Sequence, residues 1–92
     1  MRSAVVAAIL GDRDDPRRRL AALFGGEVPR SGQPPEVAMR WAMDVLERAD
    51  PRKGNGLVAS IRVLRAAEPR LTLRSARFLA AHAERRRRQR EP

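Results

Sequence analysis

The sequence predicts an all-α domain built from four or five short helices. Apolar residues recur at three- and four-residue spacing in several segments, and Gly and Pro residues separate these segments. Aromatic residues make up only 3% of the chain, so the core must consist of Ala, Val, Leu, Ile and Met, which suits packed helices. A chain of 92 residues supports one core. We expect a single domain over residues 1–84 and a mobile basic tail over 85–92.

The first apolar segment, residues 4–10, has two possible structures. Ser3 can cap a short helix that ends at Gly11. Val5, Val6 and Ile9 have a preference for β-structure, so the segment could instead form a strand.

A second helix has clearer boundaries. Asp15 is a suitable N-cap, and Pro16 follows at the first helical position. The pair Gly25-Gly26 is expected to end the helix. Residues 25–35 contain three Gly and three Pro, which predicts a linker without regular structure inside the domain.

The strongest helical pattern covers about residues 35–49. One wide apolar stripe is expected to face the core, with Trp41 as its anchor. The stripe consists of Val37, Ala38, Trp41, Ala42, Val45, Leu46 and Ala49. Met39 and Met43 lie off this stripe, and because Met adapts to irregular contacts they are a possible interface.

A helical hairpin is predicted after the turn at residues 50–56. Asn55 can cap a helix over residues 56–67, and Pro69 ends it. Thr72 then caps a final helix that leads into the arginine tail. The residues expected to face inward on the first helix are Leu57, Val58, Ile61 and Leu64. The apolar residues of the second helix are Leu73, Ala76, Leu79, Ala80 and Ala83.

Positive charge is concentrated in this hairpin and tail. The chain has a net charge of +9, and residues 62–92 hold ten Arg and three Glu. Such a surface attracts nucleic acid or another acidic partner. The candidate nucleic-acid-binding or partner-binding residues are Arg62, Arg65, Arg70, Arg74, Arg77, Arg85, Arg86, Arg87 and Arg88.

Three interpretations of these arginines remain open. A row on one helix face could neutralise successive phosphates, which makes a small accessory or regulatory protein that binds nucleic acid the leading hypothesis. In a helix–turn–helix arrangement, Arg74, Ser75 and Arg77 would lie where base edges are reached. The alternative is a protein-interaction module, an adaptor or inhibitor that docks the basic hairpin on an acidic protein surface. In the third interpretation, the arginines form a solvated basic surface that has no partner.

The hairpin also resembles a known family. Residues 61–65, Ile-Arg-Val-Leu-Arg, and residues 71–77, Leu-Thr-Leu-Arg-Ser-Ala-Arg, are similar to the C-terminal domain of the bacterial ribosomal stalk protein. In that family the basic residues of the hairpin dock translation GTPases, which implies such a role for Arg62, Arg65, Arg74 and Arg77. Thr72 and Ser75 stand where the family pattern has Gly and Glu.

Neither an enzyme nor a metal protein is expected. No pairing of acid, base and nucleophile can be assembled from the sequence, and Cys is absent. Asp12, Asp14 and Asp15 fit a helix N-terminus better than a calcium loop, and His82 is the only His. No cofactor is implied. No apolar stretch approaches the ~20 residues of a membrane span, so we expect a soluble cytoplasmic protein.

Overall fold

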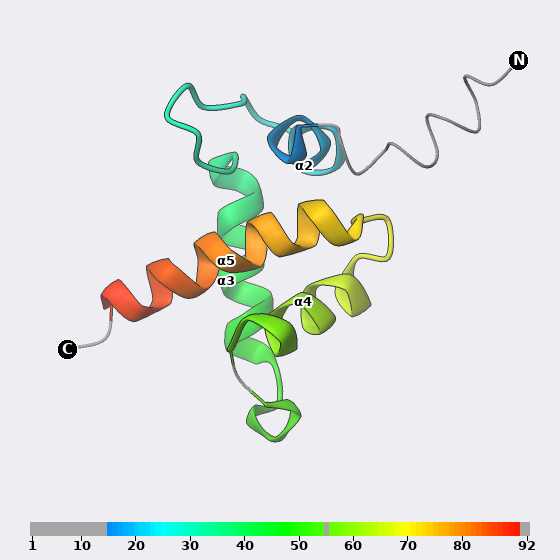
Figure 1. Cartoon of the computed structure of the whole chain (residues 1–92), viewed down its shortest axis with the longest axis vertical. Helices are drawn as coiled ribbons and strands as arrows, with labels where there is room; N and C mark the ends of the chain where they lie inside the picture. Colours follow the sequence, from blue (N-terminus) through cyan, green and yellow to red (C-terminus); the bar gives the residue numbers. More distant parts are fainter. Residues whose placement is uncertain (1–14, 55, 91–92) are drawn as a thin grey trace, which may run out of the picture.

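The computed structural model describes residues 15–54 and 56–90 and shows an all-α fold (Figure 1). The segment 4–10, Asp12, Asp14 and Asn55 lie outside the described residues. The elements are α2 (Pro16–Phe24), α3 (Glu36–Arg48), the 3₁₀ turn η2 (Pro51–Lys53), α4 (Gly56–Ala67) and α5 (Leu73–Arg90).

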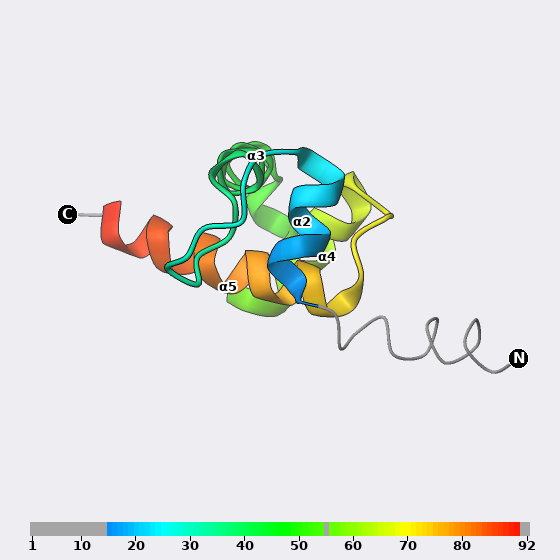
Figure 2. The ribbon, with the colours of Figure 1, turned by 90° about the horizontal axis from the view of Figure 1, so that it is seen from above.

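Helix α5 is the centre of the arrangement. It packs against α2, α3 and α4. Helices α2 and α4 lie on opposite sides of α5, while α3 crosses behind it and is seen nearly end-on in Figure 2. The α4–α5 hairpin therefore has one face toward α3 and an outer face turned away from it.

Local capping sets the ends of α2 as predicted. The Asp15 carboxylate accepts a hydrogen bond of 3.0 Å from the backbone N–H of Arg17, and Pro16 occupies the first turn. Gly25 follows the helix with φ +84°, and its N–H donates to the carbonyl of Ala21 at 2.8 Å. The predicted linker 25–35 contains no helix or strand.

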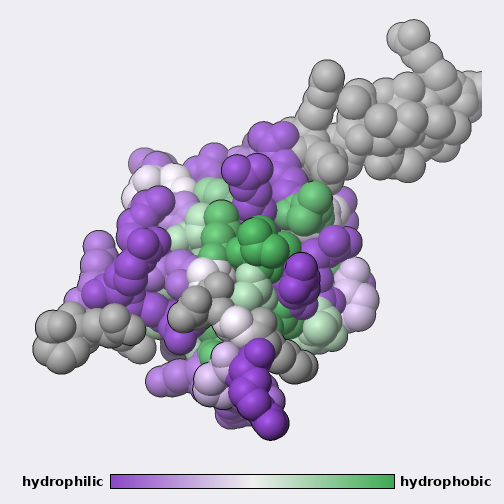
Figure 3. Space-filling view, turned by 60° about the horizontal axis from the view of Figure 1, so that its bottom comes forward, coloured by the Kyte–Doolittle hydropathy of each residue, from purple (hydrophilic) through white to green (hydrophobic). Residues whose placement is uncertain are grey.

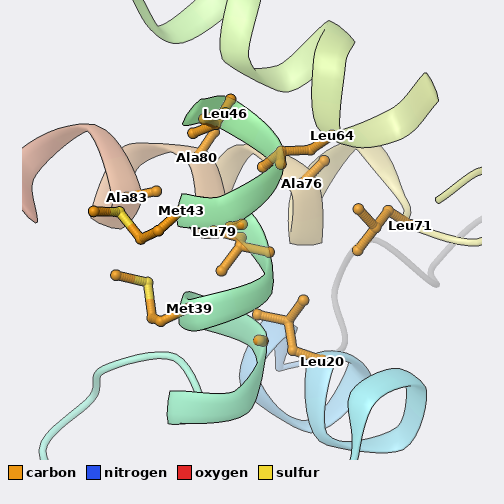
Figure 4. Close-up of a cluster of buried hydrophobic side chains, with 12 residues drawn as sticks. Leu20, Met39, Met43, Leu46, Leu64, Leu71, Ala76, Leu79, Ala80 and Ala83 are labelled. Atoms are coloured by element: carbon orange, nitrogen blue, oxygen red, sulfur yellow. The ribbon is translucent and has the colours of Figure 1, made fainter. Parts of the chain in front are cut away.

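The core forms where α5 meets the other helices (Figure 4). Small alanines on the inner side of α5 let the helices approach closely, and larger side chains fill the space between them. The buried apolar residues are Leu20 on α2, Ala38, Met39, Ala42, Met43 and Leu46 on α3, Leu64 on α4, Leu71 in the turn, and Ala76, Leu79, Ala80 and Ala83 on α5.

The inward face of α3 differs from the predicted stripe. Met39 and Met43 were expected as a possible interface, but they are 1% and 8% exposed and belong to the core. Val37 is 39% exposed, and Trp41 is only partly buried. Helix α3 is thus rotated about its own axis by part of a turn relative to the predicted orientation. The reason is that α5 offers a shallow alanine surface into which the unbranched Met side chains fit.

Trp41 packs at the edge of the core and not at its centre. Its ring lies against Phe24 of α2, with ring centroids 4.6 Å apart and the ring planes inclined by 38°. This aromatic pair is part of the contact between α2 and α3.

Both hairpin helices follow the predicted boundaries, and Ala76, Leu79, Ala80 and Ala83 of α5 are buried, but the face of α4 differs from the predicted one. The Thr72 hydroxyl caps α5 by accepting a hydrogen bond of 3.0 Å from the N–H of Ser75. On α4 the side that meets the core carries Ser60 and Leu64. Leu57 and Val58, which were predicted to face inward, are 37% and 66% exposed, and Leu73 at the start of α5 is 54% exposed.

The expected mobile tail begins as regular structure. Residues 85–90 continue α5, which runs for 18 residues. One ion pair joins this part of the helix to α3, and a second lies within α5. Arg86 forms an ion pair with Glu36 of α3 at 3.1 Å, and Arg87 forms one with Glu84 at 3.1 Å.

Candidate binding face of the C-terminal hairpin

Four of the predicted arginines form a row on α5. Arg74, Arg77, Arg85 and Arg88 are all exposed, and steps of three, eight and three residues keep them on one side of the helix. This side is opposite the buried one. Within the described part of the chain none of the four forms an ion pair. Their guanidinium groups are available to a partner.

The arginines of α4 and of the turn differ from one another. Arg62 and Arg65 are exposed on α4, and neither forms an ion pair among the described residues. Arg70 is held by Glu68, with 2.8 Å between Nη2 and Oε1. Hydrogen bonds from the Arg70 side chain and backbone lower the pKa of Glu68 to about 2, and the same pairing raises the pKa of Arg70. Arg70 therefore stabilises the turn between the helices.

Arg86 and Arg87 have intramolecular partners, although the sequence placed them in the same set. Arg86 joins α5 to α3 through Glu36, and its side chain is 32% exposed. Arg87 donates to Glu84, which also accepts a hydrogen bond from Ser60. These two arginines contribute to the fold. The predicted site therefore contains some arginines that are available to a partner and others that are paired within the protein.

An apolar groove between α4 and α5 is the part of this face that the sequence reasoning missed. It has a volume of about 610 Å³. Leu57, Val58 and Ile61 of α4 line one side, and the other side is Leu73 of α5 with Arg74 and Arg77. Ser60 and Leu64 are the buried residues of α4. Their position in the sequence relative to Val58 was the available signal, because their burial turns Val58 outward.

A second depression continues the groove along α5 and has a different chemistry. It also has a volume of about 610 Å³ and shares Leu57 with the apolar groove. Its remaining lining includes three arginines and one glutamate, and it consists of Gly56, Ala81, Glu84, Arg85, Arg87 and Arg88. The space-filling view of this side of the molecule shows apolar side chains gathered in one area with hydrophilic side chains around them (Figure 3).

The recognition-helix interpretation is wrong for one of its three residues. Ser75 is 1% exposed, and its hydroxyl lies 2.8 Å from the Thr72 hydroxyl and 3.1 Å from the Thr72 carbonyl. Ser75 therefore belongs to the cap of α5 and cannot reach a base edge. Arg74 and Arg77 remain exposed.

His82 packs against an aromatic ring. The rings of His82 and Phe78 are 4.6 Å apart on α5. Burial lowers the pKa of His82, and the neighbouring charges of Arg85 and Arg86 add to this effect. Among the described residues no three His, Asp or Glu side chains are grouped so that they could hold a metal ion.

Comparisons with protein-family models, curated proteins and solved structures find no match to this chain. None of the helices in the described ranges is long and apolar enough to cross a membrane.

Proposed function

We propose that this protein is a noncatalytic interaction module whose α4–α5 hairpin docks on an acidic surface of a partner protein. The observation that carries the proposal is the apolar groove bordered by arginines without ion pairs. Exposed Val58 and Leu73 form its apolar part, and Arg74 and Arg77 form its edge.

The combination of apolar and basic side chains favours a protein partner. Covering exposed apolar surface is favourable by roughly 25 cal/mol per Å², and the apolar side chains of a partner protein can cover it. A phosphate backbone offers none. Arginine is also enriched in the well-packed centres of protein interfaces, where its planar group can bind a carboxylate through two hydrogen bonds.

The likeness of the hairpin sequence to the ribosomal stalk protein supports the same class of function. In that family the hairpin docks translation GTPases. Arg62, Arg65, Arg74 and Arg77, which correspond to the family's basic positions, are all exposed here. A partner in the translation machinery is therefore one form of the proposal.

Nucleic acid is the second candidate, because of the arginine row on α5. Arg74 and Arg88 are separated by 14 residues, which is roughly 21 Å along a helix. Such a row could contact several phosphates, and each contact would contribute about −0.9 to the log–log dependence of affinity on salt. This candidate does not use the apolar groove.

An affinity capture with matched charge-reversal variants tests the proposal. The unmodified chain is compared with Arg74→Glu/Arg77→Glu and with the control Arg30→Glu/Arg40→Glu, which reverses two exposed arginines elsewhere. Lysates are used with and without nuclease. We expect a defined protein that survives nuclease treatment, is lost with the hairpin variant and is kept with the control.

Two results would contradict this expectation. Capture that disappears after nuclease treatment supports nucleic acid and not a protein. Capture that is weakened equally by both variants shows that only net charge matters, so that the hairpin is not a specific site.

A further inference from the structure

The two depressions along α5 differ in chemistry from one end to the other. The depression near Leu73 is apolar with arginines at its edge, whereas the depression near Arg85 and Arg88 is basic. They meet at Leu57, so they lie end to end. From Leu73 to Arg88 the helix advances 15 residues, roughly 22 Å. The two depressions together therefore form an elongated groove with one apolar end and one basic end.

We propose that this groove receives a single amphipathic, acidic α-helix of a partner protein. Apolar side chains one turn apart on that helix fill the depression formed by Val58, Ile61 and Leu73. Carboxylates further along the same helix bind Arg85 and Arg88. This inference rests on the proposed function and specifies the chemistry and the secondary structure of the partner.

The groove fits a helix better than an extended segment. A strand gains most of its binding energy by hydrogen bonding to an open sheet edge, and the described residues contain no strand. A helix satisfies its own backbone and can present side chains at three- and four-residue spacing to the space between two helices. A length of roughly 22 Å corresponds to about four helical turns.

The charges of the groove select an acidic helix and oppose a second copy of this chain. Two copies meeting by this face would bring the four-arginine row on α5 close to its equivalent. The carboxylate in the basic depression, Glu84, is already bound by Ser60 and Arg87. It offers little to a basic partner, and the charge available to a ligand is positive.

The test is a selection of peptides on the protein. A display library of helical peptides, each of about 16 residues with randomised outer positions, is selected against the unmodified chain. We expect selected peptides to carry apolar residues three or four positions apart in one half and Asp or Glu in the other half.

Variants then locate the binding. Val58→Asp is expected to weaken the affinity of a selected peptide at least tenfold, while Val28→Asp, at an exposed valine outside the hairpin, should not change it. Arg85→Glu/Arg88→Glu should weaken binding similarly. A peptide whose acidic half is changed to Lys and Arg should recover binding to that variant. Circular dichroism checks that each variant keeps its helices.

The outcomes separate the inference from the proposed function. Acidic peptides without spaced apolar residues, insensitive to Val58→Asp, would overturn the helix inference and leave docking on an acidic partner in place. A selection that enriches no acidic peptide would overturn both. A dimer in sedimentation that Val58→Asp dissociates would assign the groove to a second copy and overturn the inference.

Discussion

Ser60 of α4 donates a hydrogen bond of 2.5 Å to Glu84 of α5, 24 residues further along the chain. Ser60 is 3% exposed, and the side chain of Glu84 is 16% exposed. The same carboxylate oxygen, Oε1, accepts a hydrogen bond of 3.1 Å from Arg87. The contact joins the first half of α4 to the second half of α5.

Removing the hydroxyl should destabilise the hairpin. Ser60→Ala leaves a shielded carboxylate with one donor fewer, and the expected loss is about 1–3 kcal/mol in the free energy of unfolding. Urea denaturation measures this loss. In Glu84→Gln the loss caused by Ser60→Ala should be smaller, because the neutral amide binds the hydroxyl less strongly. Equal losses in both backgrounds would show that the charge of Glu84 does not strengthen the hydrogen bond.

The position of the α3 methionines predicts a contrast between two substitutions on one helix. Met39→Ala should lower the free energy of unfolding by about 2–5 kcal/mol, because it removes core contacts and leaves a cavity. Val37→Ala, at a side chain that is 39% exposed, should change it by less than ~1 kcal/mol. Thermal or urea denaturation compares the two. A larger effect at Val37 would support the stripe expected from the sequence.

The aromatic contact between α2 and α3 should be measurable by a double-mutant cycle. Phe24→Leu and Trp41→Leu are made singly and together, and the coupling energy is expected to be about 0.5–1.5 kcal/mol. The partial burial of Trp41 also predicts intrinsic fluorescence intermediate between those of buried and solvated tryptophan. Additive losses in the cycle would mean that the rings do not stabilise each other.

The turn between α4 and α5 should weaken in acid. The pKa of Glu68 is lowered from 4.5 to about 2 by its hydrogen bonds with Arg70. The folded state therefore binds this proton less readily than the unfolded state does, and the resulting stabilisation is present above about pH 4.5. It is lost as the pH falls through about 2.

Melting temperatures between pH 2 and 6 test this expectation. The difference in melting temperature between the unmodified protein and Glu68→Gln should become smaller over the acidic part of that range. A difference that stays constant with pH would contradict the assignment of the pKa shift to Glu68. Because the Arg70 side chain is 69% exposed, added salt should also reduce the difference.

Guanidinium geometry should matter at the edge of the groove. Arg74→Lys/Arg77→Lys keeps the charge but removes the planar fork, so binding of an acidic partner or selected peptide should weaken. The affinity is measured at one salt concentration beside a truncation that removes residues 85–92. Normal binding of the lysine variant together with lost binding of the truncation would assign the site to the basic C-terminal end of α5 and not to Arg74 and Arg77.

The helix boundaries could be predicted because they depend on local chemistry. Asp15, Gly25 and Thr72 satisfy or end the backbone of their own helix, and no distant residue is required for this. The faces of α3 and α4 could not be predicted in the same way. Spacing of three and four residues describes two adjacent stripes on α3, one with Trp41 and the other with Met39, and packing against α5 selects the second.

The candidate site was predictable only in part for the same reason. The arginine row on α5 follows from the spacing within one helix. The groove depends on how α4 and α5 are rotated relative to each other, which Ser60 and Leu64 determine through contacts with other helices. The pairing of Arg86 with Glu36 joins residues 50 positions apart, and no local pattern marks it.

The central position of α5 has a consequence for synthesis on the ribosome. Helices α2, α3 and α4 each pack against α5, and α3 also packs against α2 and α4, so their common core is complete only when α5 has been made. At typical elongation rates its 18 residues take about 1 to 4 seconds to add, and they must also leave the exit tunnel. Until then Leu20, Met39 and Leu64 lack the part of the core that α5 supplies. The helix that carries the candidate binding face therefore also completes the core.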